Sequence, residues 1–260
     1  MIKNSKIVDS ETTESKTAFS KITDSKIIVA LDFANATDAL NLVAKLDPSL
    51  CKLKVGKELF TAAGPQLVEK LIGKDFKVFL DLKFHDIPTT VAKACEAASN
   101  LGVWMLNVHA GGGGVMMHAA LEGVYKSHHQ PYLIAVTVLT SMDQFTLTSV
   151  GVNQQLDQQV LNLAKLSQHS GLHGVVCSGL EAPLLKQYLP NDFLLVTPGI
   201  RPSTANLDDQ NRVLTPTQAL NMGVNYLVIG RPITQAVDPI VALIAIQQEI
   251  KNNCASKISD

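Results

Sequence analysis

Short apolar runs alternate with longer stretches of helical spacing along most of the chain. From Lys26 onward this pair of patterns recurs eight times, roughly every thirty residues. The apolar runs are nearly continuous, which is typical of strands in a parallel sheet that is covered on both faces. Strands are therefore predicted over residues 27–32, 51–55, 76–82, 103–108, 132–139, 174–177, 193–197 and 224–229.

Helices are predicted in the intervals between these strands. The first is expected to begin at Thr37, whose hydroxyl suits an N-cap. Eight strand–helix units in roughly 235 residues is the size of a (β/α)8 barrel. The alternative is a doubly wound open sheet, which a G-x-G-x-x-G turn after the first strand would favour, and the residues after Asp32 do not form one. The predicted helices cover residues 37–46, 65–72, 88–101, 115–126, 156–170, 181–188, 215–222 and 239–251.

The predicted architecture is therefore a single α/β domain, a (β/α)8 TIM barrel over residues 26–252. Residues 1–25 are rich in Ser, Thr and Lys without a sustained period, so we expect a flexible N-terminal extension. Residues 253–260 are expected to form a short C-terminal tail.

The composition is that of a globular protein with a large core, since 46% of the residues are hydrophobic and 17% are charged. A net charge of -1 gives no reason to expect nucleic acid or a membrane surface as a partner. Cys51, Cys95 and Cys177 lie in apolar segments far apart, so buried free thiols and a reducing cytoplasm are expected. Neither a membrane-spanning run nor the apolar core of a secretory signal is recognised.

Charged residues collect where the first three strands end. Asp81 and Lys83 share one face of the third strand because they are two residues apart, and Asp86 follows just beyond it. A structural ion-pair network is one interpretation of such charges. However, Asp32 ends the first strand and Lys54 lies near the end of the second, and a barrel carries its active site at this rim. The five charges together favour an active site.

The last two strands end in residues suited to a phosphate. Gly230 and Arg231 follow the last strand, where barrels often bind phosphate, although an arginine that caps a helix is the alternative. The long polar loop over residues 201–212 is interpreted as a lid that closes over the phosphate.

Other polar features are less specific. His85 and His109 are candidates for acid–base groups, but a structural hydrogen-bonding role is favoured for each. The glycines at 111–114 suit either a tight turn or close approach to a ligand.

Together these residues resemble the orotidine 5′-phosphate decarboxylase family, in its monofunctional bacterial type. The resemblance covers residues 26–250 and rests first on the D-x-K-x-x-D-I-P pattern that begins at Asp81. The other matching segments are Val-Ala-Leu-Asp at 29–32, Leu-Lys-Val-Gly at 53–56, Asn-Val-His-Ala at 107–110, Thr-Pro-Gly-Ile-Arg-Pro at 197–202 and Val-Ile-Gly-Arg-Pro-Ile-Thr at 228–234.

The resemblance implies decarboxylation of orotidine 5′-phosphate to UMP and CO2 in pyrimidine biosynthesis, without a metal or organic cofactor. Lys83 would protonate C6 of the pyrimidine, and Asp81 would lie beside the carboxylate that leaves. Lys54 and Asp86 would complete an alternating charge array.

The resemblance also implies a homodimer with shared active sites, in which Asp86 and Thr90 reach into the site of the other subunit. The remaining implied contacts are Asp32 and Lys54 at the ribose, Thr140 and Ser141 at the pyrimidine, and Arg201, Gln210, Gly230 and Arg231 at the phosphate.

Three other functions fit parts of this pattern. A Mg²⁺-dependent decarboxylase of a sugar-acid phosphate shares the Asp-x-Lys-x-x-Asp strand end but needs an additional acidic ligand. A non-catalytic nucleotide-binding barrel predicts a broken charge array, whereas Lys54, Asp81, Lys83 and Asp86 are all present. A Schiff-base aldolase needs a deprotonated lysine, and two flanking aspartates would keep Lys83 protonated.

Overall fold

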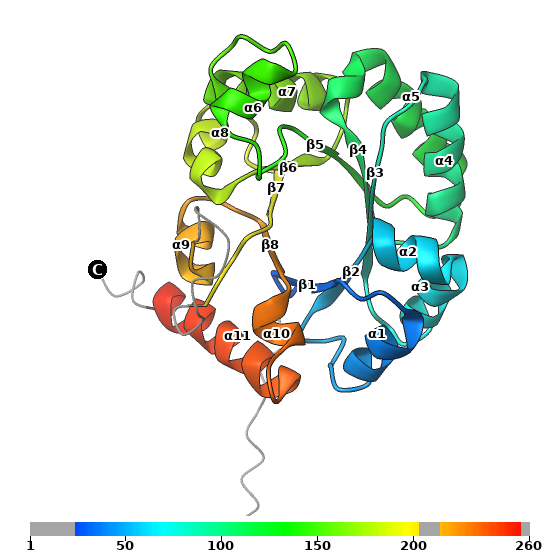
Figure 1. Cartoon of the computed structure of the whole chain (residues 1–260), viewed down its shortest axis with the longest axis vertical. Coiled ribbons are helices and arrows are strands. Elements are labelled where there is room, and N and C mark those ends of the chain that lie inside the picture. The colour runs from blue at the N-terminus through cyan, green and yellow to red at the C-terminus, as the bar shows by residue number, and fades with distance from the viewer. Residues whose placement is uncertain (1–23, 203–213, 256–260) are drawn as a thin grey trace, which may run out of the picture.

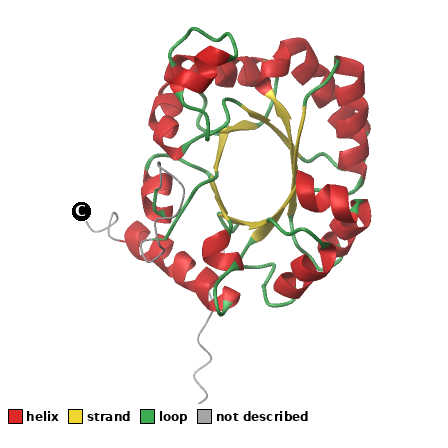
Figure 2. Cartoon of the chain, in the orientation of Figure 1, coloured by secondary structure: helices red, strands yellow, loops and turns green. Residues whose placement is uncertain are grey.

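Eight parallel strands form a closed barrel in the computed structural model, which describes residues 24–202 and 214–255. Neighbours in sequence pair with one another, and β8 closes the barrel by pairing with β1. Figure 2 shows the strands as a ring inside a ring of helices, so the predicted TIM barrel is confirmed. The strands are β1 (Ile27–Leu31), β2 (Lys52–Gly56), β3 (Val78–Phe84), β4 (Met105–His109), β5 (Tyr132–Val136), β6 (Gly174–Val176), β7 (Leu194–Thr197) and β8 (Tyr226–Ile229).

Helices cover the outside of the barrel (Figure 1). Helices α4 and α5 pack closely at Gly123. A Cβ at this position would lie only 2.1 Å from the carbonyl oxygen of Ala92, so the absence of a side chain allows the approach. The helices are α1 (Ala36–Val43), α2 (Lys57–Ala63), α3 (Pro65–Ile72), α4 (Pro88–Asn100), α5 (Gly113–Lys126), α6 (Gln144–Ser149), α7 (Leu156–His169), α8 (Ala182–Tyr188), α9 (Pro216–Asn221), α10 (Arg231–Thr234) and α11 (Pro239–Ala255), with 3-10 turns η1 (Ala110–Gly112) and η2 (Gly179–Glu181).

Apolar side chains form two layers, one inside the barrel and one between the strands and the helices. Successive residues of a strand point to opposite faces, so Phe79 lies inside the barrel while Leu80 packs in the outer layer. The inner layer contains Ile28, Ala30, Phe79, Met105, Ile134, Val196, Tyr226 and Val228. Two residues further toward the carboxyl ends, the same alternation reaches polar residues: Asp32 after Ala30, Asp81 after Phe79 and Asn107 after Met105. The strand period thus places polar groups above an apolar floor.

Several predicted boundaries shift. β3 continues beyond its predicted end to Phe84. The prediction that Thr37 caps the first helix was wrong, because Asn35 has an extended backbone and its Oδ1 accepts the N–H of Asp38 at 3.0 Å. The predicted glycine-rich turn over 111–114 is divided between two elements. Gly111 and Gly112 belong to the 3-10 turn η1, and Gly113 and Gly114 begin α5. Helices α2, α6 and α10 were not predicted, since such short segments show no clear helical period.

The amino-terminal face of the barrel holds the first described residues. Oδ1 of Asp24 lies 3.0 Å from Nζ of Lys52 and 2.9 Å from Nζ of Lys77, and its Oδ2 accepts the hydroxyl of Tyr226 at 3.0 Å. Partial burial raises the pKa of Asp24, but the hydrogen bonds from Lys77 and Lys52 outweigh it and lower the pKa to about 2. Asp24, just before β1, is therefore bound to Lys52 of β2, to Lys77 and to Tyr226 of β8, although the predicted N-terminal extension included it. The rest of that extension, residues 1–23, lies outside the described residues.

Candidate active site

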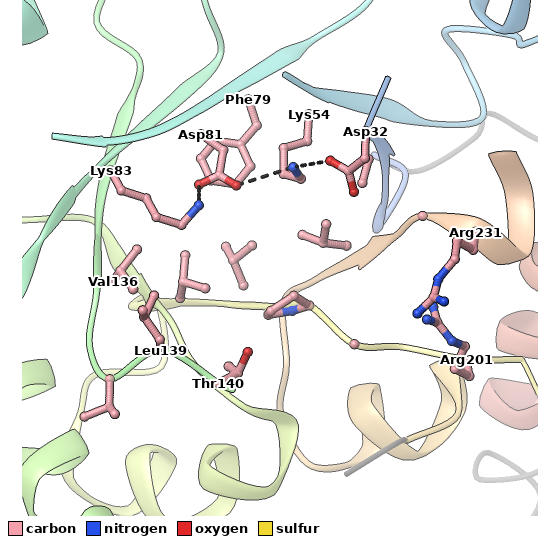
Figure 3. Close-up of a pocket in the computed structure, with 18 residues that line it drawn as sticks. Asp32, Lys54, Phe79, Asp81, Lys83, Val136, Leu139, Thr140, Arg201 and Arg231 are labelled. Carbon is pink, nitrogen blue, oxygen red and sulfur yellow. Dashed lines mark hydrogen bonds and ion pairs between the residues drawn. The ribbon is translucent and has the colours of Figure 1, made fainter. Parts of the chain in front are cut away.

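The charged side chains at the carboxyl ends of β1, β2 and β3 form a row of alternating sign (Figure 3). Nζ of Lys54 lies 3.2 Å from Oδ1 of Asp32 and 3.4 Å from Oδ2 of Asp81. Nζ of Lys83 lies 2.6 Å from Oδ1 of Asp81. Lys54 and Asp81 are buried, whereas Asp32 is exposed. Because each buried charge faces an opposite one, the row can exist inside the barrel mouth.

This row borders a cavity of about 320 Å³ at the C-terminal end of the barrel. The opposite wall is apolar, and Figure 3 shows it facing the charges across the cavity. The apolar lining consists of Ala30, Phe79, Val136, Val138, Leu139, Val176, Val196, Pro198 and Val228. A cavity of this size, with an apolar wall facing a row of charges, suits a small molecule that has an apolar part and charged or polar groups.

Two arginines line the end of the cavity that is farthest from Lys83 (Figure 3). Arg201 follows β7 and is buried, and Arg231 begins α10 directly after Gly230. Gly199, between β7 and Arg201, has a φ of 79°, a left-handed conformation that favours glycine. Gln210 and most of the predicted lid over 201–212 lie outside the described residues.

Of the other residues predicted to contact the substrate, some line the cavity and others do not. Thr140 lines the cavity, but Ser141, Asp86 and Thr90 are exposed and do not line it. Oδ1 of Asp86 accepts the backbone N–H of Ile87 at 2.7 Å. Within one chain, therefore, Asp86 and Thr90 are not part of the site.

His85 and His109 lie together at the ends of β3 and β4, with ring centroids 5.5 Å apart. Burial, and to a lesser extent the neighbouring His85, lower the pKa of His109. Neither ring lines the cavity.

Gly56 and Asn107 also lie near the charged row, although neither was predicted as a site residue. A Cβ at Gly56 would lie 3.3 Å from Nζ of Lys54, so glycine leaves room for this ammonium group. The buried amide of Asn107 donates to Oδ1 of Asp81 at 2.7 Å. Its inward position follows from the strand alternation beyond Met105, which could have identified it.

Further features concern metals, membranes and thiols. In the described parts of the chain, no three His, Cys, Asp or Glu side chains are grouped so as to hold a metal ion. No helix within residues 24–202 and 214–255 has the length and apolar character to cross a membrane. Cys51, Cys95 and Cys177 are free and buried as expected, and burial raises the pKa of Cys51 and Cys95 to about 12.

The closed barrel and the charged rim of its cavity define a (β/α)8-barrel enzyme. The chain belongs to the orotidine 5′-phosphate decarboxylase / HUMPS family, whose model matches residues 25–246. The predicted family is confirmed.

Individual relatives agree with this assignment. Orotidine 5′-phosphate decarboxylase of Nitrosococcus oceani is 61% identical over 228 residues, which is 88% of this chain and 98% of the relative. The enzyme of the same name from Pseudoalteromonas atlantica is 56% identical over 87% of this chain and 99% of the relative. A crystal structure of orotidine 5′-phosphate decarboxylase from Lactobacillus acidophilus has a TM-score of 0.79 and 41% identity, covering 87% of this chain and 99% of that one.

Proposed function

We propose that this protein decarboxylates orotidine 5′-phosphate to UMP and CO2 without a cofactor, as a cytoplasmic enzyme of pyrimidine biosynthesis. The observation that carries the proposal is the row of alternating charges along one wall of the cavity, with two arginines at its far end. Membership of the decarboxylase family supports the same reaction.

The cavity suits the three parts of this substrate. Arg201 and Arg231, together with Gly230 and Gln210, would bind the phosphate, since the guanidinium fork matches phosphate oxygens. Asp32 and Lys54 would contact the ribose hydroxyls. The pyrimidine ring would lie against the apolar wall with Thr140 at its polar edge, which brings C6 toward Lys83; Ser141 would have to turn inward from the exposed loop to reach it.

In the proposed reaction the bond between C6 and the carboxylate breaks, and both electrons stay on C6 as CO2 leaves. The ammonium of Lys83 stabilises this developing negative charge and then gives C6 a proton. Lys83 is left as a neutral amine and regains a proton from water. The balance is one orotidine 5′-phosphate and one proton giving one UMP and one CO2.

Asp81 and Lys54 would prepare the charge before the substrate arrives. The 2.6 Å contact between Asp81 and Lys83 holds the ammonium in place. Asp81 would also lie beside the leaving carboxylate, where like-charge repulsion is a second contribution. Lys54 contacts both Asp32 and Asp81 and so balances the two carboxylates. Side chains that are already oriented need little reorganisation when the carbanion forms.

The phosphate lies far from the reacting carbon in this arrangement. Its binding energy can orient the pyrimidine against Lys83 without acting on the bond that breaks. We therefore expect Arg231 to affect turnover as well as affinity.

We further propose a homodimer in which Asp86 and Thr90 complete the active site of the second subunit. Both residues are exposed and lie outside the cavity of their own chain, which supports a role toward another copy. Asp86 would then extend the alternating row beyond Lys83.

The experiment that tests the function is turnover of orotidine 5′-phosphate in excess EDTA. A Mg²⁺-dependent decarboxylase of a sugar-acid phosphate would be inactive under these conditions, and a non-catalytic nucleotide-binding barrel would bind UMP without turnover.

A further inference from the structure

The end of β3 departs from regular pairing where the site begins. Leu80 pairs with Leu106 and Phe84 pairs with Val108, so three residues of β3 lie opposite the single residue Asn107 of β4. The last of the three, Lys83, has a φ of 52°, which is uncommon for a residue with a side chain. Such an irregularity leaves backbone groups without their usual partners in the sheet.

The side chain of Asn107 compensates for this irregularity. Its Oδ1 accepts the backbone N–H of Lys83 at 2.8 Å, and its Nδ2 donates to Oδ1 of Asp81 at 2.7 Å. Asn107 is completely buried. The amide orientation is fixed by these partners, because a flipped amide would bring its NH2 against an N–H and its oxygen against a carboxylate.

We propose that Asn107 is a positioning residue for the decarboxylation, and this inference rests on the function proposed above. One amide holds both the carboxylate of Asp81 and the left-handed backbone of Lys83. The same Oδ1 of Asp81 also accepts a hydrogen bond from the ammonium of Lys83 at 2.6 Å. A shift of the Asp81 carboxylate would therefore move the Lys83 ammonium as well. An amide achieves this without adding charge to a row whose signs already alternate.

The alternative is that Asn107 only stabilises the fold. Asn225 offers a matched control, because its Oδ1 likewise accepts a backbone N–H, from Leu195 at 2.8 Å. It lies directly before β8, at the end of the barrel opposite to the site. Asn225→Ala therefore removes a comparable hydrogen bond without touching the charged row.

The test compares Asn107→Ala, Asn107→Asp and Asn225→Ala with the wild type, measuring kcat and KM for orotidine 5′-phosphate and the melting temperature. We expect Asn107→Ala to lower kcat by about 100-fold or more with KM changed by less than about threefold, since the substrate contacts persist. Asn225→Ala should lower the melting temperature but leave kcat within about twofold.

Asn107→Asp adds a readout that a purely structural role would not move. Its carboxyl would face Asp81, and two adjacent carboxyls share one proton. When protonated, the new carboxyl can donate to Asp81 and still accept from Lys83. The ratio of variant to wild-type kcat should therefore rise as the pH falls. Lys54, Lys83, His85 and His109 are the other ionisable groups near this position, and they are present in both proteins, so the comparison uses the ratio to wild type at each pH.

An inactive wild type would contradict the proposed function itself. An active wild type with Asn107→Ala retaining kcat within about threefold would overturn the inference about Asn107 alone. Equal losses of kcat in Asn107→Ala and Asn225→Ala would also overturn it. If Asn107→Ala does not fold, the pH ratio of Asn107→Asp decides, and a ratio that does not change with pH overturns the inference.

Discussion

The ammonium of Lys83 lies 2.6 Å from Oδ1 of Asp81, although the backbone of Lys83 has left the strand conformation. The contact places a cation at the mouth of the barrel and pairs it with a carboxylate. A paired ammonium suits proton donation, whereas a Schiff-base nucleophile must be a neutral amine. This relationship is the basis of the predictions that concern catalysis.

Replacing Lys83 separates chemistry from binding. Lys83→Ala should lower kcat by at least about 10⁴-fold, because it removes the group proposed both to donate the proton and to stabilise the carbanion. The dissociation constant of UMP should stay within about tenfold, roughly 1.4 kcal/mol. Lys77→Ala is the control, since Lys77 pairs with Asp24 on the opposite face. Near-normal turnover of Lys83→Ala would contradict its assignment.

Arg231→Ala tests the phosphate end of the cavity. Loss of a charge-assisted hydrogen bond of about 1.5–3 kcal/mol should reduce kcat/KM for orotidine 5′-phosphate by about 10- to 100-fold. Orotidine, which lacks the phosphate, should be much less affected. The comparison uses kcat/KM for both substrates with wild type and variant, and equal losses would show that Arg231 does not bind the phosphate.

Mixed dimers test whether Asp86 serves the other subunit. Lys83→Ala and Asp86→Ala should each be nearly inactive alone. After the two are unfolded and refolded together, half of the dimers carry both changes, and one of their two sites has both native residues. Activity should then recover to about a quarter of wild type. If Asp86 acts within its own chain, mixing should restore none.

The anchoring of Asp24 predicts a pH-dependent contribution to stability. The pKa of its carboxyl is about 2 in the folded protein and about 3.9 in an unfolded chain. Its contribution is therefore present above about pH 4 and is lost as the pH falls toward 2. Because Asp24 is largely exposed, the difference in unfolding free energy between wild type and Asp24→Asn should not exceed about 1 kcal/mol.

Urea unfolding between pH 7 and pH 3 measures this difference. Asp157→Asn, an exposed carboxyl in the first turn of α7, is the control. A difference for Asp24→Asn that stays constant over the whole range would show that the carboxyl does not titrate as described.

The alternation of apolar runs with helical stretches was sufficient to predict the barrel, since eight strand–helix units in a row leave few other topologies. It also predicted the row of charges, because Asp32, Lys54, Asp81 and Lys83 all lie near the ends of the first three predicted strands. The short helices α2, α6 and α10 could not be predicted, because tertiary contacts rather than periodicity define them.

The irregular end of β3 was also beyond the sequence. Nothing in the pattern indicates that Lys83 has a positive φ or that three residues lie opposite Asn107. The first depends on backbone geometry and the second on the register with β4. Only the pairing of the two strands reveals that Asn107 reaches both Asp81 and Lys83.

We propose that the charges of this chain are sufficient for decarboxylation. The most direct measurement follows the absorbance of orotidine 5′-phosphate with the purified full chain in excess EDTA, and identifies the product. We expect multiple turnovers, with one UMP and one CO2 formed per substrate consumed and no effect of EDTA on the rate. Absence of turnover, or activity that EDTA abolishes and Mg²⁺ restores, would contradict it.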